Sequence, residues 1–165
     1  MLIICTITKL DGKGESVKEK EENIGYLLNK ITQQMKSHLA RQLQDVNLTV
    51  AQWGIIQDLH VQEHLDEGHR RTTPAEIAER LHMDRPTMSG IVERLKGKGL
   101  LQSTPNPHDR RSFCVSLTDQ AKSLYREIEP FSERTLELAL TGVDPEAVEA
   151  LRKTVSMMIC NFVDN

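Results

Sequence analysis

The chain has 165 residues, enough for one domain with a modest core, and its 21 Lys and Arg against 24 Asp and Glu give a net charge of −3. This slightly acidic total argues against indiscriminate binding to nucleic acids. The sequence has no glycine-rich phosphate loop, nucleophile elbow, Cys-x-x-Cys or His-Glu-x-x-His array, so the enzyme classes built on those motifs are excluded. We expect no enzymatic activity and no cofactor.

Residues 1–22 form an N-terminal arm. Its apolar start, Met1–Thr8, lacks a basic leader and is too short to span a bilayer, so no membrane partner is expected. Three cysteines without a sign of secretion indicate a reduced, cytoplasmic protein. The arm fits an edge strand, a segment lying on a dimer partner or a disordered leader equally well.

Two helices are predicted next. In the first, over residues 23–47, apolar side chains keep helical spacing for about six turns: Ile24, Leu27, Leu28, Ile31, Met35, Leu39, Leu43 and Val46. Thr49 and Gln52 suggest a capping box that opens the second helix, with Trp53, Ile56 and Leu59 facing inward.

Three histidines with acidic neighbours follow in that second helix and beyond it. The spacing of His60 and His64 could hold a divalent ion, with His69 as a further weak candidate. A polar helix end that leads into a solvated loop explains the same residues, so no metal is assigned.

Two short helices joined by a tight turn are predicted over residues 73–95. The first begins at Thr73, which can cap the free amides, and Glu76 completes a capping box. The second begins after Asp84, with Pro86 in its first turn, where a missing N–H does no harm. An ordinary pair of helices inside a bundle would show the same signals.

The second of these helices has a buried back and an open front. Its buried side comprises Ile91, Val92 and Leu95, while small, polar and basic residues occupy the open side: Arg85, Pro86, Thr87, Ser89 and Gly90. Such a helix suits the major groove of double-stranded DNA. We expect base-edge or nearby phosphate contacts from Arg85, Thr87 and Ser89, and backbone contacts from Arg94, Lys96 and Lys98.

A two-stranded hairpin is predicted after the glycine-rich helix stop at residues 96–99. Residues 100–103 can run as one strand and residues 112–117 as the other, with Phe113, Val115 and Leu117 on one face. A hairpin beside a groove-reading helix has the geometry of a winged helix.

The tip of this hairpin is basic. Arg110 and Arg111 can reach the narrow, electronegative minor groove, although a solvated hairpin would carry the same residues. Asp109 is close enough in sequence to brace the guanidinium of Arg111 through a charge-assisted hydrogen bond. Residues 70–111 hold nine Lys and Arg against five acidic residues, so this block carries +4 and the rest of the chain −7. The uneven split gives an orienting attraction to phosphates.

These motifs resemble the MarR family of transcriptional regulators. Asp109–Thr118 fits the family's wing pattern, Asp-x-Arg-x-x-x-(Val/Leu)-x-Leu-Thr. Asp84–Ser89 with Val92–Gly99 looks like the recognition helix and its exit, and Leu48–Trp53 resembles the opening of the second helix. The resemblance covers about residues 24–163. It implies a sequence-specific DNA-binding repressor that binds a pseudo-palindromic operator as a homodimer and is released by a small effector.

The chain departs from the family pattern in three places. The arm of residues 1–22 is extra, and the connection from Val61 to Thr72 is longer than such proteins usually need. Gly90 stands where some relatives carry a base-contacting arginine. Base readout is therefore expected to depend more on Arg85, Thr87 and Ser89.

The remaining helices are predicted to form a dimer. Thr118 starts a long helix, Asp119 to about Leu140, in which Pro130 marks a kink or break. Asp144-Pro145 opens a last helix with an apolar stripe: Ala147, Leu151, Val155, Met158, Ile159 and Phe162. We predict a mainly α fold with an arm (1–22), a dimerisation helix (23–47), a winged helix-turn-helix (48–118) and C-terminal dimerisation helices (119–165).

An effector pocket, which the resemblance suggests for aromatic or lipophilic acids, could be lined by Met35, His38, Trp53, Ile56 and Phe131, although the same residues would serve as core. A thiol-responsive regulator would need an exposed cysteine of low pKa. Cys160 falls on a predicted buried helix face and Cys114 on a strand of the hairpin, so both are expected to pack as small hydrophobic residues, which leaves Cys5 as the open candidate. A winged helix that binds protein instead of DNA is the main alternative, and it would lack a steep salt dependence.

Overall fold

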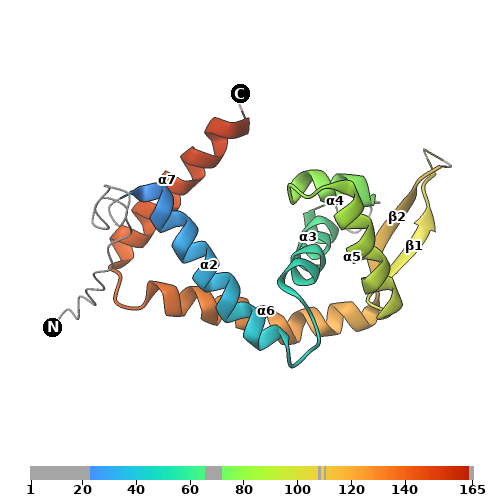
Figure 1. The fold of residues 1–165 in the computed structure, drawn as a ribbon, viewed down its shortest axis with the longest axis horizontal. Coiled ribbons are helices and arrows are strands. Elements are labelled where there is room, and N and C mark those ends of the chain that lie inside the picture. The colour runs from blue at the N-terminus through green and yellow to red at the C-terminus, as the bar shows by residue number, and fades with distance from the viewer. Residues whose placement is uncertain (1–22, 66–71, 108, 110, 164–165) are drawn as a thin grey trace, which may run out of the picture.

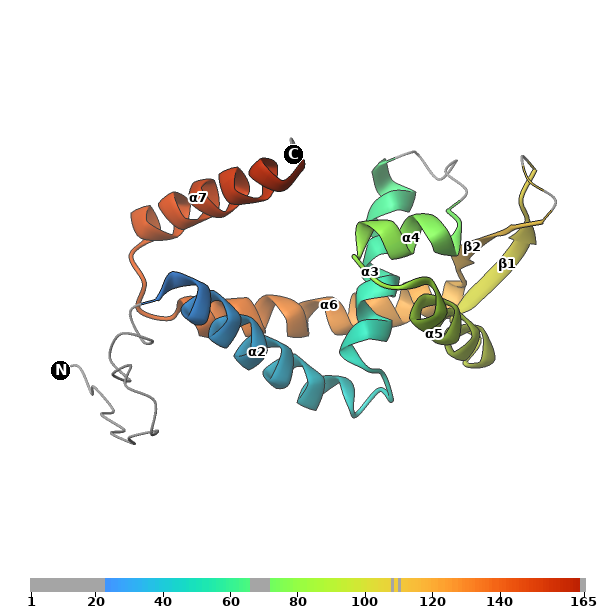
Figure 2. The same cartoon turned by 45° about the horizontal axis from the view of Figure 1, so that its top comes forward.

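The computed structural model describes residues 23–65, 72–107, 109 and 111–163. It is mainly helical, with a small two-stranded sheet. Figure 1 shows two lobes, one built from α3, α4, α5 and the β1–β2 hairpin, the other from α2, α7 and the end of α6. Helix α6 runs along the molecule and belongs to both lobes, as the turned view in Figure 2 also shows.

Helices α2 (Ile24–Leu43) and α3 (Val50–Leu65) begin where the sequence predicts. The Asn23 side chain accepts the backbone N–H of Tyr26 at the start of α2, and α2 ends three residues before Val46. The predicted capping box of α3 is present, because Thr49 and Gln52 exchange side-chain and backbone hydrogen bonds of 3.1 and 3.2 Å. Helix α3 runs on to Leu65, so the long connection predicted from Val61 is shorter than expected.

Helices α4 (Pro74–Arg80) and α5 (Arg85–Gly97) form the predicted helix-turn-helix. The turn between them contains His82 in a left-handed conformation. Helix α5 ends in a Schellman motif: Gly99 takes a φ of 70°, its N–H donates to the carbonyl of Lys96, and Leu100 N–H donates to the carbonyl of Leu95. Glycine is needed there because other residues rarely adopt that φ.

Strands β1 (Leu101–Pro105) and β2 (Phe113–Leu117) pair antiparallel, with Leu101 opposite Leu117 and Pro105 opposite Phe113. Both begin one residue later than predicted, and β1 extends two residues further. Of the three residues placed on one face of β2, Val115 and Leu117 are buried, whereas Phe113 near the tip is 39% exposed. Its ring lies below the ammonium group of Lys96, 5.4 Å from the ring centre.

Helices α6 (Asp119–Leu140) and α7 (Pro145–Val163) complete the chain. The Thr118 side chain caps α6 by accepting the N–H of Ala121 at 3.2 Å. Helix α6 continues through Pro130, so the break that proline could have caused does not occur. None of the described helices is long and apolar enough to cross a membrane.

The core lies in the lobe that carries the helix-turn-helix. It joins α3, α4, α5, the base of the hairpin and the first half of α6, and its fully buried side chains include Trp53, Ile56, Ile77, Leu95 and Ile128. The ring of Tyr125 stacks between those of Trp53 and His60, at 5.2 and 3.6 Å. This packing holds the helix-turn-helix on α6.

Candidate nucleic-acid interface

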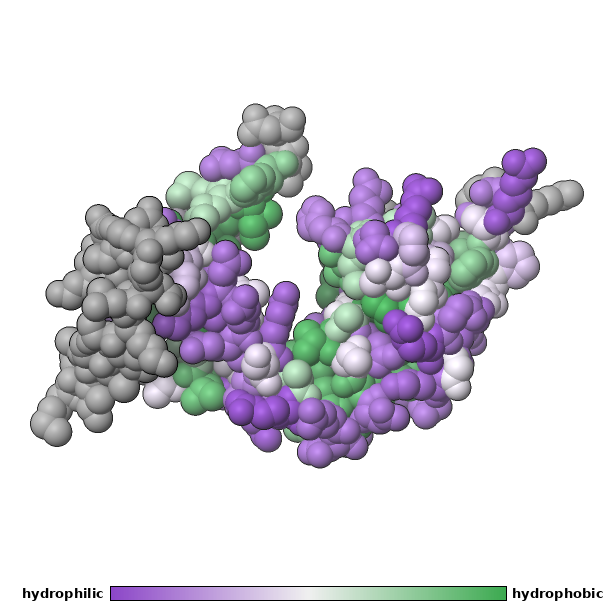
Figure 3. Space-filling view, in the orientation of Figure 1, coloured by the Kyte–Doolittle hydropathy of each residue, from purple (hydrophilic) through white to green (hydrophobic). Residues whose placement is uncertain are grey.

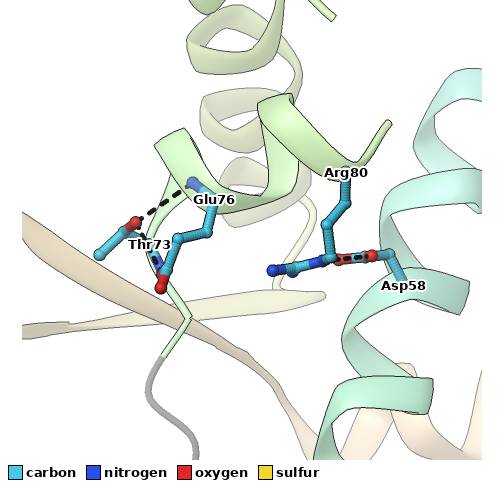
Figure 4. A network of polar contacts seen from close by, with 4 residues as sticks. All are labelled: Asp58, Thr73, Glu76 and Arg80. Carbon is cyan, nitrogen blue, oxygen red and sulfur yellow. Dashed lines mark hydrogen bonds and ion pairs between the residues drawn. The ribbon is translucent and has the colours of Figure 1, made fainter. Parts of the chain in front are cut away.

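The start of α4 is fixed by the predicted capping box. Thr73 Oγ1 accepts the N–H of Glu76 at 3.3 Å, and Glu76 Oε2 accepts the N–H of Thr73 at 2.7 Å (Figure 4). These bonds satisfy amides that a helix start leaves free. They set where α4 begins, and through the turn they also set where α5 begins.

A bidentate ion pair fixes α4 against α3. Arg80 Nε and Nη2 donate to the two carboxylate oxygens of Asp58 at 2.8 and 2.6 Å (Figure 4). The Asp58 side chain is only 8% exposed, and its hydrogen bond raises the pKa of Arg80 above the usual value. The charge of Arg80 is therefore neutralised within the protein, and Arg80 no longer counts among the basic residues of segment 70–111 that could attract phosphates. No local signal in the sequence marks this pair, because its partners lie 22 residues apart.

Helix α5 presents the open front that its sequence predicts. Asp84 Oδ1 accepts the N–H of Thr87 at 2.9 Å, which caps the helix and lowers the pKa of the Asp84 carboxyl. The buried side holds Met88, Ile91, Val92 and Leu95. The side chains on the front are exposed: Arg85, Pro86, Thr87 and Ser89.

Gly90 leaves space on this front. A Cβ built there would meet only the guanidinium of Arg94, at 3.6 Å. Arg94 itself is exposed one turn further along the helix. Because Gly90 has no side chain, no bulk projects from the front of α5 between Arg85 and Arg94.

Lys96 and Lys98 are both half-buried and already engaged within the chain. Lys96 pairs with Glu93 at 3.0 Å. Lys98 Nζ donates to the carbonyl oxygen of Asn47, in the turn between α2 and α3, and to Gln52 Oε1 at 3.3 Å. The ammonium group of Lys98 therefore ties the end of α5 to that turn, and its contact with the DNA backbone stays a prediction.

The tip of the hairpin corrects the role predicted for Asp109. Its Oδ1 accepts the backbone N–H of Arg111 at 2.9 Å, and its carbonyl accepts the N–H of Ser112 at 3.0 Å. Asp109 thus braces the turn through the backbone, and within the described residues it forms no ion pair with the Arg111 guanidinium. Arg110 lies outside the described residues.

A groove of about 540 Å³ separates the hairpin from the helix-turn-helix. Its walls come from the starts of α4 and α5 and from the hairpin, and they include Arg85, Ser89, Arg111 and Phe113. In the part of the chain that the structure describes, the guanidinium groups of Arg85, Arg94 and Arg111 have no hydrogen bond or ion pair. These three cations are available to an external anion.

The residues predicted to line an effector pocket separate in the structure. Trp53 and Ile56 are core residues, 1% and 0% exposed, and Phe131 packs against the same core. Met35 and His38 instead line a hollow of about 240 Å³ between α2 and α6. The five residues therefore do not share one pocket: the alternative role as core holds for Trp53, Ile56 and Phe131. Helical spacing alone cannot distinguish core positions from pocket walls.

The weak metal candidates also find other partners. His60 stacks on Tyr125 and lies 4.2 Å from the ring of His64, and burial, followed by His64, lowers the pKa of His60. Burial and a hydrogen bond to Glu129 raise the pKa of Tyr125 to about 12. No group of three or more candidate ligands gathers among the described residues, and His69 lies outside them.

The two described cysteines differ. Cys114 is buried, as predicted, whereas Cys160 on α7 is exposed in the single chain and not on a buried face. Cys5 lies outside the described residues.

A helix-turn-helix followed by a two-stranded wing defines a winged helix-turn-helix protein. Comparisons with known proteins agree. The sequence profile of the MarR family matches residues 46–112. The transcriptional repressor NicR of Pseudomonas putida is 32% identical over 123 residues, which cover 74% of this chain and 73% of NicR. The chain belongs to the MarR family of transcriptional regulators.

Solved structures show the same fold. The structure of Bordetella bronchiseptica BpsR, described for the regulation of its DNA binding by 6-hydroxynicotinic acid, is 26% identical, with a TM-score of 0.71 over 84% of this chain and 94% of BpsR. The S. aureus MepR–DNA complex is 19% identical, with a TM-score of 0.73 over 86% of this chain and 98% of MepR. A mutant of E. coli MarR in complex with operator DNA is 19% identical, with a TM-score of 0.74 over 87% of this chain and 99% of that one.

Proposed function

We propose that the chain is a homodimeric repressor that binds a pseudo-palindromic operator through α5 and the wing, and that a small acid releases it. The observation that supports the DNA contact is the set of three guanidinium groups, those of Arg85, Arg94 and Arg111, which have no partner among the described residues and lie on or beside the exposed front of α5. Thr87 and Ser89 supply polar side chains for base edges on that front, and the wing supplies Arg111 for the minor groove.

The dimer is proposed from apolar surface that the single chain leaves open. On α7, Ile159 is 60% and Phe162 86% exposed, and on α2 Ile24 is 67% exposed. Figure 3 shows hydrophobic residues along α7. Large apolar side chains exposed along a helix are typical of an interface, and a second copy of the chain would bury them in a two-fold arrangement.

Two matched variants test the dimer. Ile159→Asp places a charge on the apolar stripe of α7, whereas Ser156→Asp places the same charge at an exposed position outside the stripe. Sedimentation should show a monomer for Ile159→Asp and a dimer for the wild type and Ser156→Asp. Only the dimers should bind one operator with two half-sites about 10 base pairs apart, centre to centre. A stable wild-type monomer at micromolar concentration would refute the proposal.

The effector is proposed to bind in the hollow between α2 and α6. There the Thr135 hydroxyl donates to the carbonyl of Phe131 at 2.8 Å, and His38 Nδ1 lies 3.0 Å from Thr135 Oγ1 and 3.5 Å from Gln42 Nε2. The shorter contact favours the tautomer in which Nδ1 donates to Thr135, and in that tautomer the longer contact with the Gln42 amide nitrogen is not a hydrogen bond. This tautomer leaves His38 Nε2 as an acceptor in a hollow that Arg41 also lines. An aromatic acid with a hydroxyl or N–H donor matches this pair, and the regulation of BpsR by 6-hydroxynicotinic acid supports that class.

Calorimetry with 6-hydroxynicotinic acid and with unsubstituted nicotinic acid tests the assignment. The wild type should bind the hydroxylated acid more tightly, and Arg41→Met should weaken both acids, because it removes the cation that meets their shared carboxylate. Operator DNA should lower the affinity for the acid by the same factor as the acid lowers the affinity for operator. Equal binding of the hydroxylated acid by wild type, His38→Ala and Arg41→Met would refute this site.

A further inference from the structure

The outer edge of β2 is fastened to the rest of the chain by two hydrogen bonds. Val115 N–H donates to the carbonyl of Thr72 at 2.8 Å, and Leu117 N–H donates to Glu63 Oε1 at 3.4 Å. Strand edges are otherwise open to water and fray. Both bonds lie at the root of the wing, where β2 leads into α6.

Glu63 connects three elements through one carboxylate. Oε1 accepts from Leu117 on β2, while Oε2 pairs with Lys122 on the first turns of α6 at 2.9 Å. Glu63 itself belongs to α3, and its side chain is 21% exposed. A partly shielded, charge-assisted pair holds its geometry better than a fully solvated one.

The position of the wing tip depends on this root. A strand of five residues spans about 17 Å, so a rotation of about 10° at Leu117 would displace the tip by about 3 Å. That displacement is as large as a hydrogen bond is long, and it would move Arg111 out of contact with a phosphate or base edge.

We propose that Glu63 is a positioning residue for the wing: it does not touch DNA, but it holds the root of β2 so that Arg111 at the tip can. The proposal rests on the proposed role of the wing in operator binding. It also explains an acidic residue in a DNA-binding lobe, where simple electrostatics would favour its absence.

The test compares Glu63→Met, which removes both interactions, with Glu63→Gln, which keeps an acceptor for Leu117. Glu79→Gln on α4 is the charge-matched control, since Glu79 is exposed. On a duplex operator selected from random sequences, Glu63→Met should weaken binding at least fivefold, the equivalent of about 1 kcal/mol. Glu63→Gln should recover most of this loss, and Glu79→Gln should bind at least as tightly as the wild type.

A double-mutant cycle separates positioning from general destabilisation. If Glu63 acts through the wing, adding Glu63→Met to the Arg111→Ala variant should lower operator affinity by less than a further twofold. Hydrogen exchange at the Leu117 amide should be faster in Glu63→Met, which shows the loosened root directly in folded protein.

The possible failures can be told apart. An effect of Arg111→Ala without one of Glu63→Met would overturn the positioning role alone. Full additivity of the two variants would also overturn it, because Glu63 would then act elsewhere. If Arg111→Ala bound the operator as tightly as the wild type, the proposed role of the wing would be overturned, and this inference with it.

Discussion

Replacing Asp109 with alanine sets two effects of opposite sign against each other at the tip of the wing. The substitution removes a negative charge from the surface proposed to face DNA, which favours binding. It also removes the acceptor of the 2.9 Å hydrogen bond from the backbone N–H of Arg111, which loosens the turn that places this arginine. The sign of the change in operator affinity therefore shows which effect is larger.

The magnitudes favour the hydrogen bond. A unit charge about 10 Å from a phosphate in water contributes about 0.4 kcal/mol, and physiological salt screens part of it. A hydrogen bond to a charged group contributes about 1.5–3 kcal/mol net, and an exposed turn keeps this one at or below the low end of that range. We expect Asp109→Ala to weaken binding by about 0.5–1 kcal/mol per wing, or roughly two- to fivefold.

Asp109→Asn is the matched control, because its amide oxygen can still accept the Arg111 N–H while the charge is gone. Fluorescence anisotropy on the selected operator, at one fixed salt concentration, should rank Asp109→Asn at or above the wild type and Asp109→Ala below both. If the asparagine variant bound as weakly as the alanine variant, the carboxylate charge would matter, as in direct bracing of the guanidinium. Unchanged or tighter binding by Asp109→Ala would refute the role of the turn.

Three further predictions follow from contacts in the helix-turn-helix lobe. Arg80→Ala leaves a buried carboxylate on α3 without its partner, so urea unfolding should show a loss of about 2 kcal/mol, below that for a fully buried pair because Arg80 is partly solvated. Gly90→Ala should raise the free energy of unfolding by up to about 1 kcal/mol through helix propensity, yet weaken operator binding, because the added methyl group lies on the front of α5. The pKa of His60 is lowered in the folded chain, so as the pH falls this imidazole is protonated in the unfolded chain before it is protonated in the folded one. The free energy of unfolding should therefore fall as the pH drops below about 6.5. Urea titrations at pH 7.5 and 5.5 should show a smaller difference for His60→Phe; an identical difference would contradict the assignment.

The features that sequence predicted well are those that depend on neighbouring residues. The caps at Thr49, Thr73 and Asp84 join groups three residues apart, so composition and spacing were sufficient to place three helix starts. The Schellman motif at Gly99 is equally local.

Contacts between distant segments could not be predicted in this way. Lys98 and Arg80 were counted as part of one basic block, but their partners come from the α2–α3 turn and from α3. The sequence left open whether Trp53 and Met35 line one pocket or belong to the core. In the structure Trp53 is buried in the core, while Met35 lines the hollow between α2 and α6. A helical period identifies an inward face but not what lies opposite it.

The junction at Thr118 has a mechanical consequence for the molecule. Its hydroxyl donates to the carbonyl of Gly99 at 2.8 Å and its N–H donates to the carbonyl of Leu100 at 3.2 Å, so the exit of α5, the base of the wing and the start of α6 meet at one residue. Helix α6 has 22 residues and is therefore a stiff rod of about 33 Å. A tilt of about 5° at its far end, beside the hollow lined by His38, would carry α5 and the wing together through about 3 Å. In the proposed dimer, α6 would thus convert a small change beside this hollow into a different separation of the two helix-turn-helix units, without bending either unit.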